Sequence, residues 1–236
     1  MKRLSAAVFA GIVIVLSISC GSVDLARKYP NMVADADPVS AGSFTTQFDK
    51  FFSSQMNTAV VEVIFHPRLN STALVFRYQA VTYRQFWDEN GRRRFTEALE
   101  WYKTDYAERN LSNKYRQTRA IYGKINGRLE WESFKLAKTR ISSPVIEIGY
   151  RFRRVNDNDM PFLTVLMRSA KEQADMGDSS NLVDSQQISM YFTRAQADEL
   201  VKLFDQSYLL ALVNVRAGEE TGEPLKPDVY VEYEAP

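Results

Sequence analysis

The feature that most constrains this fold is a series of short segments in which apolar and polar residues alternate between turn-forming stretches. Residues 145–154 alternate most regularly, and because successive side chains of a strand point to opposite faces, they predict a strand with one buried and one wet face. Residues 156–159 are all Asn or Asp, and 162–169 alternate again, which predicts an antiparallel hairpin. We expect Ile146, Ile148, Tyr150 and Phe152 on the buried face, and Glu147, Arg151 and Arg153 on the wet one.

Other β-branched and aromatic runs predict further strands. Residues 58–65 and 72–87 form two extended runs joined by turn chemistry at 67–70, and a change in the phase of the apolar positions predicts a bulge or bend near Ala80 in the second run. A last strand is expected at 188–192.

Asn126-Gly127 is the strongest hairpin signal in the chain. It joins two strand-like runs, 118–125 and 128–134, and a two-residue turn at this dipeptide would pair Ile125 with Arg128. We therefore predict a hairpin in which Tyr122 faces Trp131.

Three segments show the spacing of helices. Residues 43–54 place Phe44, Phe48, Phe51 and Phe52 at helical intervals behind Ser43, and residues 94–110 carry an aromatic stripe. The strongest helix begins after Thr193, which forms a capping box with Gln196. Its apolar stripe comprises Ala197, Leu200, Val201, Phe204, Tyr208 and Leu212.

Together these segments predict a single α+β domain over residues 43–215, with a mostly antiparallel sheet of about six or seven strands covered by helices near 94–110 and 194–213. The aromatic content of 12% suits such a β-rich core. Residues 20–42 are small, polar or turn-forming, so we expect a flexible tether, the alternative being an arm lying on the domain. Residues 216–236 are acidic and contain prolines, which predicts a mobile tail.

The first twenty residues indicate where the protein is located. Lys2 and Arg3 precede a short apolar run at 8–16, and small residues lead to Cys20, the only cysteine in the chain. This segment resembles the leader of bacterial lipoproteins, in a relaxed form similar to that of spirochaetal lipoproteins, with Leu16 four residues before the cysteine. The resemblance implies a signal peptide at 1–19, a lipid on Cys20 and anchoring to the inner or outer membrane of the cell envelope.

Few side chains suggest catalysis or metal binding. His66 is the only histidine and follows a strand, so we interpret it as structural. The carboxylate pairs Glu97 with Glu100 and Glu130 with Glu132 each lie on one side of one element, whereas hydrolytic carboxylates face each other across a cleft. We therefore predict no catalytic residue, no cofactor and no metal.

Two polar runs have alternative interpretations. Residues 156–159 are rich in oxygen ligands but lack the glycine and the distant glutamate of an EF-hand loop, which favours a plain turn over a calcium site. Residues 92–94 are three arginines that could meet lipid head groups, although a solvated helix start is the simpler interpretation.

The sequence leaves three functional classes open. With 30 basic and 29 acidic side chains, its overall charge gives no reason to expect nucleic acid as a partner. We expect a non-enzymatic, lipid-anchored envelope protein that binds a partner or maintains the envelope. The alternatives are a periplasmic module that binds a lipid or small molecule in an apolar or aromatic pocket, and a carboxylate-dependent hydrolase.

Overall fold

The computed structural model describes residues 37–50, 55–112, 121–133, 139–173 and 182–221. The strands are β1 (Val39–Asp49), β2 (Met56–His66), β3 (Ser71–Tyr78), β4 (Val81–Asp88), β5 (Ile121–Asn126), β6 (Arg128–Ser133), β7 (Thr139–Ser142), β8 (Val145–Val155), β9 (Asn158–Met167) and β10 (Ile188–Phe192). The helices are α2 (Glu89–Ala107), α3 (Arg194–Phe204) and α4 (Gln206–Thr221), and a short 3-10 turn, η1, spans Pro67–Leu69.

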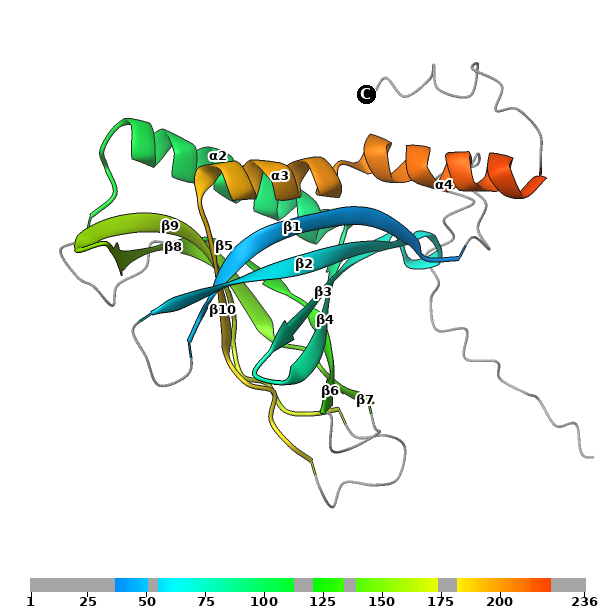
Figure 1. Ribbon diagram of the computed structural model, residues 1–236, viewed down its shortest axis with the longest axis horizontal. Coiled ribbons are helices and arrows are strands. Elements are labelled where there is room, and N and C mark those ends of the chain that lie inside the picture. Colours follow the sequence, from blue (N-terminus) through cyan, green and yellow to red (C-terminus); the bar gives the residue numbers. More distant parts are fainter. Residues whose placement is uncertain (1–36, 51–54, 113–120, 134–138, 174–181, 222–236) are drawn as a thin grey trace, which may run out of the picture.

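All ten strands belong to one antiparallel sheet, in the order β5-β8-β9-β10-β1-β2-β3-β4-β6-β7. The sheet curls into a half-barrel, and α2 and α3 lie along one side of it (Figure 1). Strand accounts for 52% and helix for 29%, so the predicted α+β class with about six or seven strands is wrong: the protein is mostly sheet. Three strands are absent from the prediction. They are β7, one of the two strands within 72–87, and β1, for which the aromatic spacing predicts a helix.

β1 shows why the aromatic spacing at 43–54 misleads. Phe44 and Phe48 are four residues apart, and this even spacing also places both side chains on one face of a strand. Both are buried, with Thr46 between them. The phase shifts only at the start of the strand, where Gly42 has a φ of 128° at a bulge next to Ser40. Residues 51–54, with Phe51 and Phe52, lie outside the described residues.

The single run expected at 72–87 is a hairpin. Gln79 and Ala80 have φ values of 51° and 61°, and Tyr78 pairs with Val81, as in a two-residue turn with left-handed backbone at both positions. Neither residue is Gly, Asn or Asp, so the sequence carries no usual signal for this turn. The predicted turns at 67–70 and 156–159 are confirmed, the second as the hairpin between β8 and β9.

β5 and β6 are not a hairpin, so the prediction from Asn126-Gly127 is wrong. β5 pairs with β8, where Ile125 faces Ile146, whereas β6 pairs with β4 and β7. The chain therefore passes at Gly127 from one end of the sheet towards the other. The Gly127 amide donates a hydrogen bond to the Pro144 carbonyl at 3.0 Å, which holds the crossing point against the start of β8.

Replacing Gly127 by Ala should destabilise the protein. A Cβ at this position would lie 2.2 Å from Ile146 Cδ1, and Ile146 is fully buried, so the core must shift. Overpacking of this kind costs about 1–3 kcal/mol in the free energy of unfolding. The control is Gly123→Ala in the same strand segment, where an added Cβ meets no atom within 4 Å. Urea melts should separate the two variants, and equal midpoints would mean that the crossing tolerates a side chain.

The outer side of β8 is not wet, in contrast to the prediction from its alternation. Glu147 is 6% exposed and lies between Lys124 Nζ at 3.3 Å and Arg168 Nη2 at 2.8 Å. Burial alone would raise the pKa of the Glu147 carboxyl, but the hydrogen bonds and positive charges of Arg168 and Lys124 together lower it. The carboxylate therefore stays ionised in a protein environment.

The helices close the core from the inner side of the sheet. α2 begins at Glu89, earlier than the predicted residue 94, because the Asp88 side chain accepts a hydrogen bond from the Gly91 amide at 2.6 Å and caps the helix. Its buried face meets α3 in an aromatic cluster. The cluster comprises Trp87, Phe95, Phe192 and Phe204, with ring centroids 5.6 to 5.9 Å apart in the contacting pairs.

The predicted capping box at Thr193 and Gln196 is confirmed, but the helix after it is two helices. The backbone leaves the helical region at Asp205, whose carboxylate accepts a hydrogen bond from the Tyr208 amide at 2.8 Å at the start of α4. α4 runs to Thr221, so the first residues of the predicted tail at 216–236 are helical. The signal peptide at 1–19 and Cys20 lie outside the described residues, and β1 begins within the predicted tether at 20–42.

Candidate functional site

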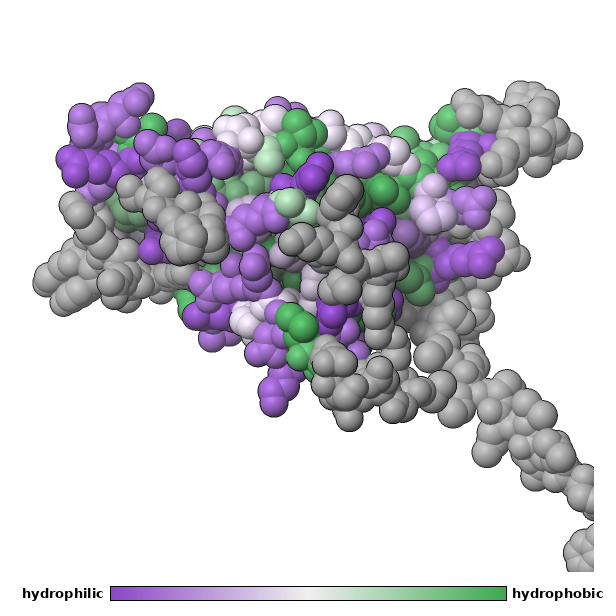
Figure 2. Space-filling model, turned by 60° about the horizontal axis from the view of Figure 1, so that its bottom comes forward, coloured by the Kyte–Doolittle hydropathy of each residue, from purple (hydrophilic) through white to green (hydrophobic). Residues whose placement is uncertain are grey.

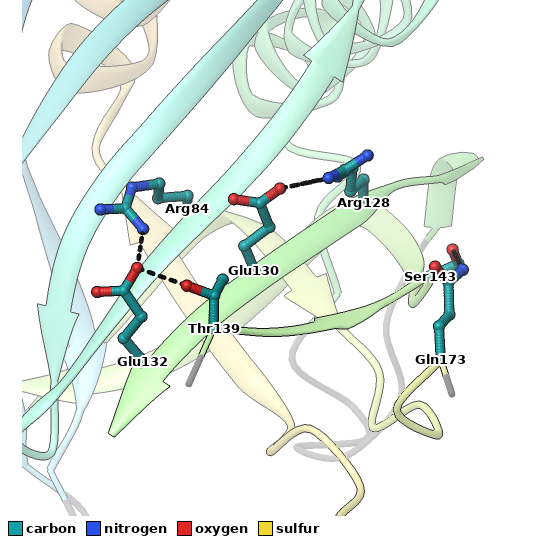
Figure 3. Close-up of polar contacts among 7 residues, drawn as sticks. All are labelled: Arg84, Arg128, Glu130, Glu132, Thr139, Ser143 and Gln173. Atoms are coloured by element: carbon teal, nitrogen blue, oxygen red, sulfur yellow. Dashed lines mark hydrogen bonds and ion pairs between the residues drawn. The ribbon is translucent and has the colours of Figure 1, made fainter. Parts of the chain in front are cut away.

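The carboxylates Glu130 and Glu132 on β6 are held by basic neighbours (Figure 3). Arg84 Nη1 lies 2.7 Å from Glu132 Oε1, which also accepts a hydrogen bond from the Thr139 hydroxyl at 2.9 Å. Glu130 pairs with Arg128 at 2.6 Å. The hydrogen bond from Arg84, followed by that from Thr139, lowers the pKa of the exposed Glu132 carboxyl. Each carboxylate thus has a basic partner, and Arg84, Arg128, Glu130 and Glu132 form a charge ladder and not two acids opposed across a cleft.

Strands β6 and β7 lie at the bottom of the molecule in Figure 1, and from that side the coloured surface is largely hydrophilic, with apolar side chains in small groups (Figure 2). At the neighbouring edge, the Gln173 side-chain amide donates a hydrogen bond to the Ser143 hydroxyl at 2.7 Å (Figure 3). The described side chains in this view thus satisfy one another, and they leave no pair of opposed carboxylates.

Glu97 and Glu100 on α2 are similarly engaged. Glu97 pairs with Arg94 at 3.2 Å, and Glu100 pairs with Lys103 at 2.9 Å. Lys103 also contacts Asp198 at 2.6 Å, which links α2 to α3. This second predicted pair of carboxylates therefore stabilises helices and does not face a cleft.

His66 and the Asn/Asp turn at 156–159 have no arrangement suited to chemistry. Burial lowers the pKa of His66, although the nearby Glu130 charge acts in the opposite direction, and its ring centroid lies 5.4 Å from that of Phe86. Asp157 is an exposed turn residue that pairs weakly with Arg154 at 3.6 Å. Within the described residues, no group of three or more His, Cys, Asp or Glu side chains could hold a metal ion.

The three arginines at 92–94 do not share one environment, because Arg92 is buried and the other two are exposed. The prediction of a solvated helix start is therefore wrong for Arg92. Arg92 is 2% exposed and donates hydrogen bonds to the Asn70 carbonyl at 3.0 Å, the Asn70 side chain at 3.1 Å and the Gln206 side chain. It thereby joins η1, α2 and the start of α4. Arg93 and Arg94 point outward and pair with Glu97.

A cleft of about 560 Å³ lies beside Arg92, between η1 and the break from α3 to α4. Its polar lining mixes both signs of charge, since Arg92 and Arg93 are accompanied by Asp88, Glu89 and Asp205. Arg92 already donates its hydrogen bonds to the surrounding backbone and amide groups. We therefore interpret this cleft as a structural contact between η1, α2 and α4.

A second groove, of about 510 Å³, has a different composition. It lies where α2 ends and α3 begins, above strands β8 and β9, and we call it the arginine–aromatic groove. The residues that define it are Tyr106, Arg109, Leu111, Phe152, Pro161 and Arg194. Its lining contains two arginines together with apolar and aromatic residues, but no Asp or Glu.

Local structure positions both arginines. Arg109 follows the last turn of α2 in a left-handed conformation, with a φ of 60°. Its amide bonds to the Tyr106 carbonyl at 3.3 Å, and the Asn110 amide bonds to the Asp105 carbonyl at 2.8 Å, the two bonds of a Schellman motif. Arg194 is the first residue of α3, and its guanidinium carbon lies 4.0 Å from the Tyr106 ring centroid.

The two arginines of this groove form no ion pair with an acidic side chain of the described residues. Neither residue belongs to a motif in the sequence, because each is isolated from the other in the chain. Arg109 carried one usable signal, its position in the last turn of the helix expected at 94–110.

The helices that the structure describes include none that is long and apolar enough to cross a membrane. No curated protein and no solved structure matches the chain. A family model described as "Uncharacterised Treponema protein" matches residues 40–211, which run from the start of β1 into α4. The match covers most of the chain, and the protein therefore belongs to this family.

Proposed function

We propose that this protein is a lipid-anchored component of the cell envelope whose half-barrel domain binds a partner molecule without catalysing a reaction. The observation that supports binding is the arginine–aromatic groove, in which two arginines face no carboxylate among the described residues. The carboxylates at 97, 100, 130 and 132 are instead engaged by lysine or arginine. A hydrolase would need opposed acids whose pKa values differ, and the described residues do not bring such a pair together.

The anchor is proposed from the leader and the lone cysteine. A lipid on Cys20 would be separated from β1 by residues 21–38, and a chain of this length reaches at most about 65 Å when fully extended, at up to 3.6 Å per residue. The domain could thus bind molecules well away from the bilayer surface. The leader implies the cell envelope, and either membrane is compatible with this geometry.

Changing Cys20 to Ser should release the protein from membranes. Serine has no thiol to carry the thioether-linked lipid, so the variant should move from the detergent phase to the aqueous phase in detergent partitioning. Ser19→Ala is the matched control, because it keeps a small residue before the cysteine and should partition like the wild type. If Cys20→Ser still enters the detergent phase, the proposed anchor is wrong.

A periplasmic ligand-binding module remains the second candidate, and the groove favours it in a modified form. The inner face of the sheet beneath α2 and α3 is filled by Phe95, Phe192 and Phe204. A ligand would therefore bind in the open groove beside the helices and not within this packed part of the core. Lipid anchoring and ligand binding are compatible, and the two are tested separately.

A further inference from the structure

Building on the proposed binding function, we infer that the arginine–aromatic groove is a site for a small anionic amphiphile. In this site a phosphate or carboxylate head group meets the guanidinium groups of Arg109 and Arg194, and a short hydrocarbon portion lies against Leu111 and Phe152. The occupant is a free small molecule and not the surface of a bilayer.

Charge complementarity supports an anion. Guanidinium groups form paired hydrogen bonds with carboxylate and phosphate oxygens, and such charge-assisted bonds are stronger than neutral ones. Other arginines of the domain already form ion pairs with carboxylates, Arg84 with Glu132 and Arg153 with Asp49. Arg109 and Arg194 have no such protein carboxylate within the described residues, so their donors are available to a ligand.

Shape and apolar lining support a small amphiphile. A volume of about 510 Å³ lies in the range of small-molecule sites, which is roughly 300–1,000 Å³. Leu111, Phe152 and Pro161 line the groove and are half-buried, so part of their apolar surface is accessible to a ligand. Inorganic phosphate alone would leave this apolar wall wet, whereas a hydrocarbon portion would cover it.

The backbone conformation of Arg109 allows its role in binding to be tested separately from protein stability. A Schellman motif usually has glycine at the left-handed position, because side chains with a Cβ are strained there. Arg109 occupies that position, with a φ of 60°. Glycine would therefore suit the backbone at this position better than arginine does. Replacing Arg109 by Gly is therefore expected to keep or improve stability while removing a head-group contact.

The experiment uses the full lipidated chain held in phosphatidylcholine nanodiscs, with protein-free nanodiscs as blanks. Isothermal titration with hexyl phosphate should show saturable binding, and inorganic phosphate and hexanol should each bind at least about tenfold more weakly. Arg109→Gly and Arg194→Gln should each weaken hexyl phosphate binding about tenfold or more, since each removes a charge-assisted contact. The thermal midpoint of Arg109→Gly should equal or exceed that of the wild type.

Arg154→Gln is the matched control, because Arg154 is an exposed arginine on β8 that pairs with Asp157 outside the groove. It should bind hexyl phosphate like the wild type. Equal weakening by Arg154→Gln would reduce the effect to general charge attraction and overturn the site. If hexanol binds as tightly as hexyl phosphate, the site does not recognise an anion. If inorganic phosphate binds as tightly as hexyl phosphate, the site does not recognise a hydrocarbon portion.

The bilayer is tested as a rival occupant by preparing the nanodiscs with phosphatidylglycerol. Hexyl phosphate should bind as before, and suppression of its binding by this anionic lipid would mean that the groove faces a membrane surface. Absence of hexyl phosphate binding with normal release by Cys20→Ser would overturn this inference alone. Failure of the Cys20 test would instead contradict the anchored function and leave the groove unaffected.

Discussion

Replacing Phe204 by Ala should lower the free energy of unfolding by about 3–5 kcal/mol, the usual cost of removing a buried phenylalanine and leaving a cavity. Phe204 is 4% exposed at the end of α3, and its ring centroid lies 5.6 Å from that of Trp87 and 5.7 Å from that of Phe95. These two neighbours belong to the end of β4 and to α2. The substitution thus removes contacts that join both covering helices to the sheet. Its cost is a large share of the roughly 5–15 kcal/mol that is the total free energy of unfolding of a typical domain.

Lys202→Ala is the control on the same helix, because Lys202 is exposed and an exposed lysine can be truncated within about 0.5 kcal/mol. Guanidinium melts of the two variants should give clearly separated midpoints, with Phe204→Ala much the lower. Similar midpoints would mean that α3 contributes little to the core. The apolar face of α3 would then be available to a partner.

Elements specified by neighbouring residues were predictable from the sequence. The capping box at Thr193 depends on two residues three apart, and the buried position of Phe204 follows from helical periodicity. The hairpin at 156–159 is similar, because Asn156 and Asp157 adopt the left-handed conformation that their side chains tolerate. In each case the local preference and the tertiary contacts favour the same conformation.

The partners of β5 and β6 were not predictable, because they lie far away in the chain. Asn126-Gly127 favours a hairpin locally, yet β5 pairs with β8 and β6 with β4. This arrangement places Leu129 at 0% exposure and sets Ile125 against the fully buried Ile146. Burying such side chains is worth about 1.5–3 kcal/mol each, which exceeds the preference of a single turn. The glycine is needed instead for its small size at a close approach.

For the candidate site, too, the sequence indicates only what neighbouring residues specify. Cys20 is predicted from a local pattern, but it lies outside the described residues, so the structure does not address it. Arg92 was singled out as part of a basic run, and only the fold shows that it is buried against Asn70. Arg109 and Arg194 come from segments separated by β5 to β10, so no sequence window contains both. Their meeting depends on how α2 ends and α3 begins over the same strands.

The second large effect is expected at Glu172, which joins the edge strand β7 to the segment that follows β9. Glu172 forms an isolated bridge with Ser142, and the Gln173 amide donates to the Ile141 carbonyl at 2.7 Å. The Glu172 carboxylate pairs with Arg140 and also accepts a hydrogen bond from the Val183 amide at 3.0 Å. The side chain of Glu172 is only 3% exposed, so this ion pair lies in the interior.

Glu172→Ala should therefore lower the free energy of unfolding by about 3–5 kcal/mol, because breaking a buried ion pair leaves the opposite charge in a poorly solvated place. The double variant Glu172→Leu with Arg140→Leu should lose less than Glu172→Ala, since apolar replacement of both partners removes the charges as well as their attraction. Urea unfolding of the three proteins measures both differences. A double variant less stable than the single one would show that these side chains hold β7 through their hydrogen bonds to the backbone and not through their mutual charge.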